Sequence, residues 1–149
     1  MRHSVDRILR PHEADDLAQE IGYLDFNDSR LQPILKAVSG FFPVSYEKPS
    51  YVRVEHKPVG HPWHTDQGNK GHMSWCKYSA SVLLTRPVFD FSGGGFYFRD
   101  DPDRPIFAFC DLIVWDGDDE NVHCCASHKG NRRVLIMFFG RDDGANTES

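Results

Sequence analysis

The chain has 149 residues and a formal net charge of −5, and 40% of its residues are hydrophobic and 13% aromatic. This length suits one domain with one core, and the apolar content excludes a disordered or collagen-like chain. The acidic balance argues against an electrostatic grip on nucleic acid, which needs a basic surface, so we do not expect nucleic acid as a partner.

The cysteines and the apolar runs indicate the cellular compartment of the protein. The four cysteines form no C-x-x-C motif, and the first residues contain no apolar stretch of the secretory type. No apolar run approaches the roughly 18–20 residues of a membrane helix. We therefore expect reduced thiols in an intracellular, cytoplasmic protein with no membrane partner, and the sequence predicts no particular oligomeric state.

Two helices are predicted in residues 1–43. The stretch 10–24 has Pro11 in a first turn, acidic residues near the start and Gly22 as a stop signal. The stretch 29–42 repeats apolar residues at helical spacing. We interpret this region as a helical support for the rest of the chain.

After Pro43 the pattern changes to short β-rich segments separated by turn residues. About eight strands in so short a region are typical of a sandwich, barrel or jelly roll. We expect a single domain over 1–149, with a β core at 51–140 and a polar tail at 141–149. The expected strands are 51–57, 63–66, 77–85, 95–99, 106–109, 111–116, 122–128 and 132–140.

His64 and Asp66 stand two positions apart in an expected strand. Side chains at i and i+2 lie on the same face of a strand, so an imidazole and a carboxylate point together here. Two ligands are too few for a stable metal site, and the candidate third ligands are His72, His123 and His128. We choose His123, which begins its strand after a turn. Two histidines and one carboxylate form the facial triad typical of non-haem Fe(II) oxygenases.

Two other interpretations stay open at this point. A His-x-Asp pair arises by chance in many proteins, and histidines are common in purely structural roles. The competing metal hypothesis is a zinc site built from His123, Cys124, Cys125 and His128. It is the weaker hypothesis, because adjacent residues of one strand point to opposite faces.

The final expected strand is preceded by Gly-Asn-Arg-Arg. Alternation separates the two arginines, and Arg132 shares its face with Val134, Ile136 and Phe138. A buried guanidinium needs an anion, because an unpaired buried charge is costly, and it binds a carboxylate through two hydrogen bonds. For Arg133 we expect pairing with an acid of the N-terminal helices.

The motifs together resemble those of the Fe(II)/2-oxoglutarate-dependent dioxygenases, most of all their prolyl-4-hydroxylase-like branch. Each motif is weak alone, but their order and spacing are specific. The resemblance implies a mostly β protein with N-terminal helices and a double-stranded β-helix core, a cupin-like jelly roll. The motifs are HTD (64–66), GGGFYF (93–98), CDLIVWDG (110–117), VH (122–123) and GNRRVLIMFF (130–139).

The resemblance also implies the roles of individual residues. His64, Asp66 and His123 would hold Fe(II). The co-substrate 2-oxoglutarate would bind this iron at one end and Arg132 at the other, with O₂ as the second co-substrate and ascorbate as a supporting reductant.

One position departs from the pattern of the family. Many relatives carry a tyrosine on the third core strand that helps to hold the far carboxylate of 2-oxoglutarate. The matching position here is Leu83. We expect Ser81, or less strongly Lys77, to contribute instead, because both share the face of Leu83.

The implied activity is that of an oxygenase that couples oxidative decarboxylation of 2-oxoglutarate to hydroxylation of a prolyl or other residue in a peptide or protein. One alternative is the same chemistry on a free small molecule or nucleobase. Another is a non-enzymatic cupin-like module that binds a metal or ligand, but Arg132 beside an intact triad favours an oxygenase. Loop 67–76 and segment 86–92 are expected to form the mouth of the site.

Overall fold

A computed structural model describes residues 1–44, 49–56, 60–66, 75–102, 108–117 and 121–140. The N-terminal part of the described chain alternates short strands and helices, and the remainder is β. The elements are β1 (Arg2–Val5), α1 (Pro11–Ala18), β2 (Gly22–Tyr23), a 3-10 turn (Ser29–Leu31), α2 (Gln32–Phe41), β3 (Tyr51–Glu55), β4 (His61–His64), β5 (Tyr78–Leu83), β6 (Phe91–Gly93), β7 (Phe96–Phe98), β8 (Leu112–Asp116), β9 (His123–Cys125), β10 (His128–Gly130) and β11 (Val134–Phe139).

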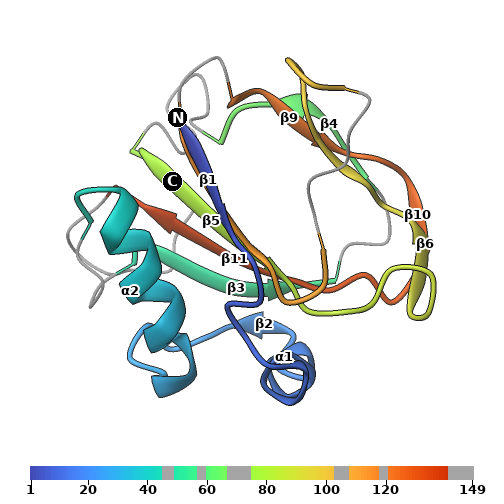
Figure 1. The fold of residues 1–149 in the computed structure, drawn as a ribbon, viewed down its shortest axis with the longest axis horizontal. Helices are drawn as coiled ribbons and strands as arrows, with labels where there is room; N and C mark the ends of the chain where they lie inside the picture. Colours follow the sequence, from blue (N-terminus) through green and yellow to red (C-terminus); the bar gives the residue numbers. More distant parts are fainter. Residues whose placement is uncertain (45–48, 57–59, 67–74, 103–107, 118–120, 141–149) are drawn as a thin grey trace.

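The larger layer is a six-stranded antiparallel sheet in the order β1-β8-β5-β11-β3-β2. Both helices lie on one side of this sheet (Figure 1). Alternate residues of the central strands point toward the helices and are apolar, among them Val52 and Val54 of β3 and Ala80 and Val82 of β5. The resulting core includes Leu17, Ile34, Leu35, Val54, Val82 and Leu135, all buried.

The opposite face of the six-stranded sheet is called the inner face here. Strand register orders its residues in rows, because directly paired residues lie on the same face. One row is Trp115, Ser79, Phe138 and Tyr51, and the next is Ile113, Ser81, Ile136 and Arg53. A third row contains Leu83, Val134 and Glu55.

The second layer consists of a three-stranded sheet, β4-β9-β7, and the pair β10-β6. It lies across from the inner face, on the side away from the helices (Figure 1). Aromatic residues fill part of the space between the layers, where Phe96 and Phe98 pack with Ile113 and Trp115. The protein is therefore mostly β, with antiparallel sheets in a jelly-roll-like arrangement. Neither helix in the described ranges is long and apolar enough to cross a membrane.

Several elements differ from those predicted. Strands β1 and β2 fall inside the region expected to be only helical, and β6 was not expected at all. The expected strand 122–128 is two strands, β9 and β10, which belong to different sheets. Of the expected strand 106–109, residues up to 107 lie outside the described part, and Phe109 forms an isolated bridge with Leu83. The tail 141–149 also lies outside it.

Candidate active site

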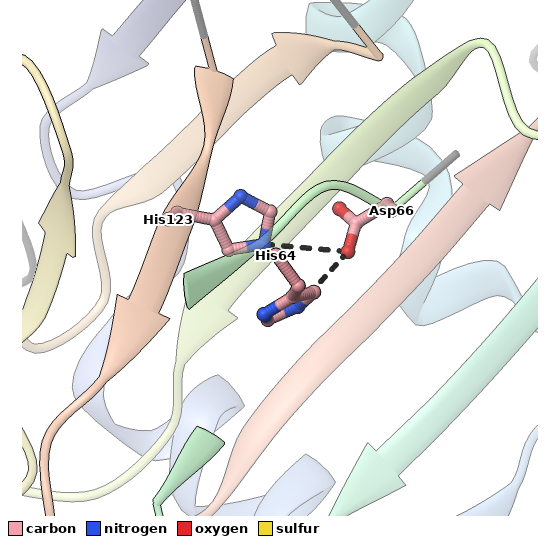
Figure 2. A group of neighbouring side chains, drawn as sticks. All are labelled: His64, Asp66 and His123. Atoms are coloured by element: carbon pink, nitrogen blue, oxygen red, sulfur yellow. Dashed lines mark ion pairs between the residues drawn. The ribbon is translucent and has the colours of Figure 1, made fainter. Parts of the chain in front are cut away.

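His64, Asp66 and His123 converge between the two layers (Figure 2). His64 ends β4, His123 begins β9, and the two residues are paired in register, so their side chains lie on the same face. Asp66 follows two residues after His64. One ligand atom from each residue lies within 4.8 Å of the others, a spacing that fits ligands around a single ion. The predicted third ligand is therefore brought to the first two.

Backbone contacts orient both histidines. The Nδ1 atom of His64 lies 2.7 Å from the Pro62 carbonyl oxygen, and that of His123 lies 2.8 Å from the Asn121 carbonyl oxygen. A carbonyl only accepts, so Nδ1 carries a hydrogen in both rings, and Nε2 is the nitrogen directed at Asp66. These Nε2 atoms lie 3.6 Å and 3.3 Å, respectively, from Oδ1 of Asp66. A hydrogen bond from the other ring nitrogen, here Nδ1, to a backbone carbonyl is typical of histidines that ligate a metal.

The other carboxylate oxygen of Asp66 is held by two side chains. Ser79 donates a hydrogen bond to Oδ2 at 2.7 Å, and the Trp115 indole donates to the same atom at 3.0 Å. Burial alone raises the pKa of Asp66, but the contacts with His123, His64 and Ser79 outweigh it and hold the pKa below its ordinary value. The carboxylate therefore stays ionised with Oδ1 aimed at the histidines.

Ser79 and Trp115 are candidate site residues that the sequence reasoning missed, since both hold Asp66. A signal was present for Ser79, since it shares a face with Ser81 and Leu83 in the expected strand. Cys76 completes this group, with its sulfur 3.7 Å from the Ser79 hydroxyl. Burial, reinforced by the charge of Asp66, raises the pKa of the Cys76 thiol to about 12, so it remains a neutral neighbour.

The three ligand residues differ in exposure. The side chain of His64 is 37% exposed, against 8% for Asp66 and 4% for His123. The site is thus enclosed on the side of β9 and open toward solvent on the side of His64. We expect a substrate to approach from that open side.

Arg132 lies at the far end of the inner face, just before β11, and is only 8% exposed. Its Nε donates to the Gly94 carbonyl at 2.9 Å, and its guanidinium lies 5.9 Å from the Phe91 ring centroid. Burial lowers its pKa, opposed by electrostatic attraction from Cys125 and Glu55. A Cβ atom at Gly94, whose φ is +70°, would lie 2.6 Å from Cδ of Arg132. Glycine here leaves room for the arginine.

Arg133 points to the other side of the sheet, as predicted, but its partner differs from the expected acid. Its Nη1 donates to the Ala18 carbonyl at 2.8 Å, at the end of α1. A helix C-terminus carries partial negative charge and carbonyl groups without helical partners, so it serves a cation as a carboxylate would.

The four remaining candidate residues of the sequence analysis lie in different parts of the structure. Ser81 is buried on the inner face, between the ligand support Ser79 and the Leu83 position. Lys77 is exposed and lies just before β5. Ser79 lies between Lys77 and the Arg132 end of the strand, so the structure does not bring Lys77 close to Arg132. His128 lies on β10, paired with Gly93, and does not join the ligand group. His72 lies outside the described residues.

Segment 86–92 lies at the Arg132 end of the inner face, and its place at the mouth of the site stays a prediction. Gly130 pairs with Phe91, and the Asn131 amide donates to the Asp90 carbonyl at 2.9 Å. The segment therefore lies beside the start of β11, at the opposite end of β5 from Ser79. Residues 67–74 of the other expected mouth loop lie outside the described part.

Replacing Ser79 by alanine is expected to weaken metal binding without unfolding the protein. The change removes the 2.7 Å bond that holds Oδ2 of Asp66. Loss of such an outer contact typically costs about 10–100-fold in metal affinity. Titration with Co(II) in the absence of 2-oxoglutarate measures this loss. Ser81→Ala is the matched control on the same strand face, and an equal loss in both variants would contradict the assignment.

No protein-family model matches the chain, and a search of curated proteins finds no match. Solved structures of similar fold do exist. The viral collagen prolyl hydroxylase of Paramecium bursaria Chlorella virus-1, in its 2-oxoglutarate complex, is 13% identical with a TM-score of 0.64 over 93% of each chain. A Pseudomonas putida prolyl-4-hydroxylase is 14% identical with a TM-score of 0.65, covering 94% of this chain and 92% of its own.

A third similar structure is an oxidoreductase of the 2-oxoglutarate–Fe(II) oxygenase family from Burkholderia pseudomallei. It is 17% identical with a TM-score of 0.55, covering 97% of this chain and 86% of its own. At these identities the likeness concerns the fold. The chain therefore has the fold of these oxygenases, and the resemblance predicted from the motifs is confirmed at that level.

Proposed function

We propose that this protein is an Fe(II)- and 2-oxoglutarate-dependent dioxygenase that hydroxylates a prolyl or other residue of a peptide or protein. The observation that carries the proposal is the convergence of His64, Asp66 and His123, with the Nε2 atoms of both histidines 3.6 Å and 3.3 Å from one carboxylate oxygen. The fold supports it, and we infer that residues 51–140 build a double-stranded β-helix core within a single domain.

The donor set fits Fe(II). Two neutral imidazole nitrogens and one carboxylate oxygen, from adjacent strand ends, leave the remaining positions of an octahedral ion open. When bound, the iron supplies the redox chemistry that converts 2-oxoglutarate, O₂ and a substrate C–H bond into succinate, CO₂ and a hydroxylated substrate. The chain's own residues hold the ligands in place: Ser79 and Trp115 fix Asp66, and two backbone carbonyls fix the histidines.

The far carboxylate of 2-oxoglutarate is assigned to Arg132. Arg132 is buried at the end of the inner face, where burial acts against its charged form. The far carboxylate of the co-substrate would supply negative charge beside this guanidinium in a poorly solvated region. Ser81, buried in the row nearer to the metal ligands, is the proposed additional hydrogen-bond donor.

A peptide or protein is the proposed substrate class. Two of the similar structures described above are named as prolyl hydroxylases, and this supports a prolyl residue as a candidate target. The exposed side of His64 offers a surface where an extended chain could approach the ligand group.

Succinate formation tests the proposal. Purified protein with Fe(II), 2-oxoglutarate and ascorbate is assayed against a panel of proline-containing peptides, free amino acids and oligonucleotides. We expect substrate-stimulated succinate release with a peptide and a mass gain of one oxygen in that peptide. Turnover with only a free small molecule or an oligonucleotide would contradict the substrate class. No succinate under any condition, despite bound metal, would favour the non-enzymatic module.

A further inference from the structure

Two tyrosines and an arginine form a polar patch at the β2–β3 edge of the inner face. Arg53 of β3 is paired in register with Tyr23 of β2, and its guanidinium lies 5.0 Å from the Tyr23 ring centroid. The rings of Tyr23 and Tyr51 meet edge-on at 5.4 Å, and Tyr51 also packs against Phe138 at 4.9 Å. Tyr23, Tyr51 and Arg53 are called the Arg53 platform below.

The platform has unused binding capacity. The Nε atom of Arg53 is enclosed and has no hydrogen-bond partner in the described part of the chain. An enclosed donor without an acceptor is unfavourable, and native proteins rarely keep one without a reason. Arg53 as a whole is only partly buried, so the residue stays within reach of a bound molecule. Tyr23 is 50% exposed and offers an aromatic surface beside it.

The neighbouring charge indicates which acceptor fits. Glu55 lies two residues along the same strand face, where the Tyr51 hydroxyl donates to its carboxylate at 3.3 Å. Burial acts to lower the pKa of Arg53, but neighbouring Tyr51 and Glu55 raise it overall. With a carboxylate already close, a second full negative charge gains little. A neutral carbonyl oxygen, as in a peptide main chain, suits the position better than an anion does.

Strand register gives the separation between the platform and the ligand group. Ser79, which holds Asp66, is paired with Phe138, and Phe138 is paired with Tyr51. Neighbouring strands lie about 4.8 Å apart, so Tyr51 is about 10 Å from Ser79 across the sheet. Arg53 lies one row further along β3, and Asp66 lies beyond Ser79, so an extended peptide needs at least three residues to span the separation.

We propose that the Arg53 platform binds the main chain of the peptide substrate three or more residues from the residue that is hydroxylated. Arg53 donates to a main-chain carbonyl oxygen, and the exposed ring of Tyr23 packs against the adjoining side chain. This inference rests on the proposed function, and it makes the preferred substrate an extended peptide and not a single amino acid.

Binding without turnover tests the platform separately from the activity. The protein is loaded with Mn(II) and 2-oxoglutarate under anaerobic conditions and titrated calorimetrically with acetyl-(Pro-Ala)₃-amide and with acetyl-proline amide. We expect Arg53→Met to weaken binding of the longer peptide by roughly ten- to a hundredfold, the value of a hydrogen bond to a charged group. Binding of the single-residue amide and the affinity for 2-oxoglutarate should change less than about twofold. Arg53→Lys should recover part of the loss.

Arg86→Met is the matched control. Arg86 also lies over an aromatic ring, 4.3 Å from the Phe109 centroid, but it is paired with Asp15 away from the inner face. We expect this variant to bind the longer peptide like the parent protein. Three results would overturn the proposal: no binding of the longer peptide by the parent protein, an equal loss in both methionine variants, or a loss of 2-oxoglutarate affinity in Arg53→Met. Each can occur while succinate formation by the parent protein is retained.

Discussion

Asp66→Ala and His123→Ala are expected to abolish stoichiometric Fe(II) binding while the protein remains folded. Each change removes one of the three proposed ligand atoms in the described part of the chain, and Asp66 is also the group that both Nε2 atoms face. Loss of outer contacts alone costs about 10–100-fold in affinity, so loss of a ligand should exceed a hundredfold. Metal analysis after anaerobic gel filtration measures the iron content, and circular dichroism checks the fold.

His128→Ala is the control for this result. His128 is also largely buried and lies on β10, the strand that follows β9 in the chain, but it is not part of the ligand group. We expect His128→Ala to retain its iron. Metal loss in His128→Ala with iron kept in His123→Ala would show that the third ligand is misassigned. Because protons compete with the metal for imidazole nitrogens, iron affinity of the parent protein should also fall as the pH is lowered.

Much of this site followed from strand alternation alone. His64 and Asp66 were placed on one face because they are two residues apart, and the same rule put Arg132 and Arg133 on opposite faces. The placement of the arginines agrees with the structure, where Arg132 contacts Gly94 and Arg133 reaches the end of α1. Alternation succeeds for them because one face of the sheet is covered by helices and the other by the second layer, so each face has its own chemistry. For the other pair the expected strand was wrong, since β4 ends at His64 and Asp66 reaches it from the bend that follows.

The sequence did not predict which residue along each strand lies level with the proposed metal ligands. Alternation groups Lys77, Ser79, Ser81 and Leu83 on one face of β5 without saying which of them lies level with the metal ligands. That level depends on how β5 stands opposite β4, a strand of the other sheet to which it is not hydrogen-bonded. Ser79 proved to be the residue that contacts Asp66, and Lys77 lies beyond the strand.

Strand β1 was missed for a different reason. Its four residues have little apolar alternation, and it is an edge strand held by pairing with β8. Such a strand forms through tertiary contacts that a local pattern does not contain. The division of 122–128 into β9 and β10 likewise depends on partners, since each half pairs with a different strand.

Arg132→Ala is expected to raise the 2-oxoglutarate requirement by roughly ten- to a hundredfold with iron still bound. A charge-assisted, two-pronged contact to a carboxylate is worth about 1.5–3 kcal/mol, which corresponds to that range. Arg132→Lys should recover only part of the affinity, because an ammonium group does not reproduce the planar fork. The dependence of succinate formation on 2-oxoglutarate concentration, together with iron content, measures both effects.

Two further variants complete this test: Arg133→Ala is the control, and Gly94→Ala displaces the Arg132 side chain without removing it. Arg133 donates to the Ala18 carbonyl behind the sheet, so its replacement should lower thermal stability and leave the 2-oxoglutarate requirement nearly unchanged. At Gly94 an added methyl group would lie 2.6 Å from Cδ of Arg132, so the side chain must move away from its present position. Gly94→Ala should therefore raise the co-substrate requirement as Arg132→Ala does, although the arginine is still present. If Arg133→Ala and Arg132→Ala exchange their effects, Arg132 is not the co-substrate residue and the inner face does not bind 2-oxoglutarate as proposed.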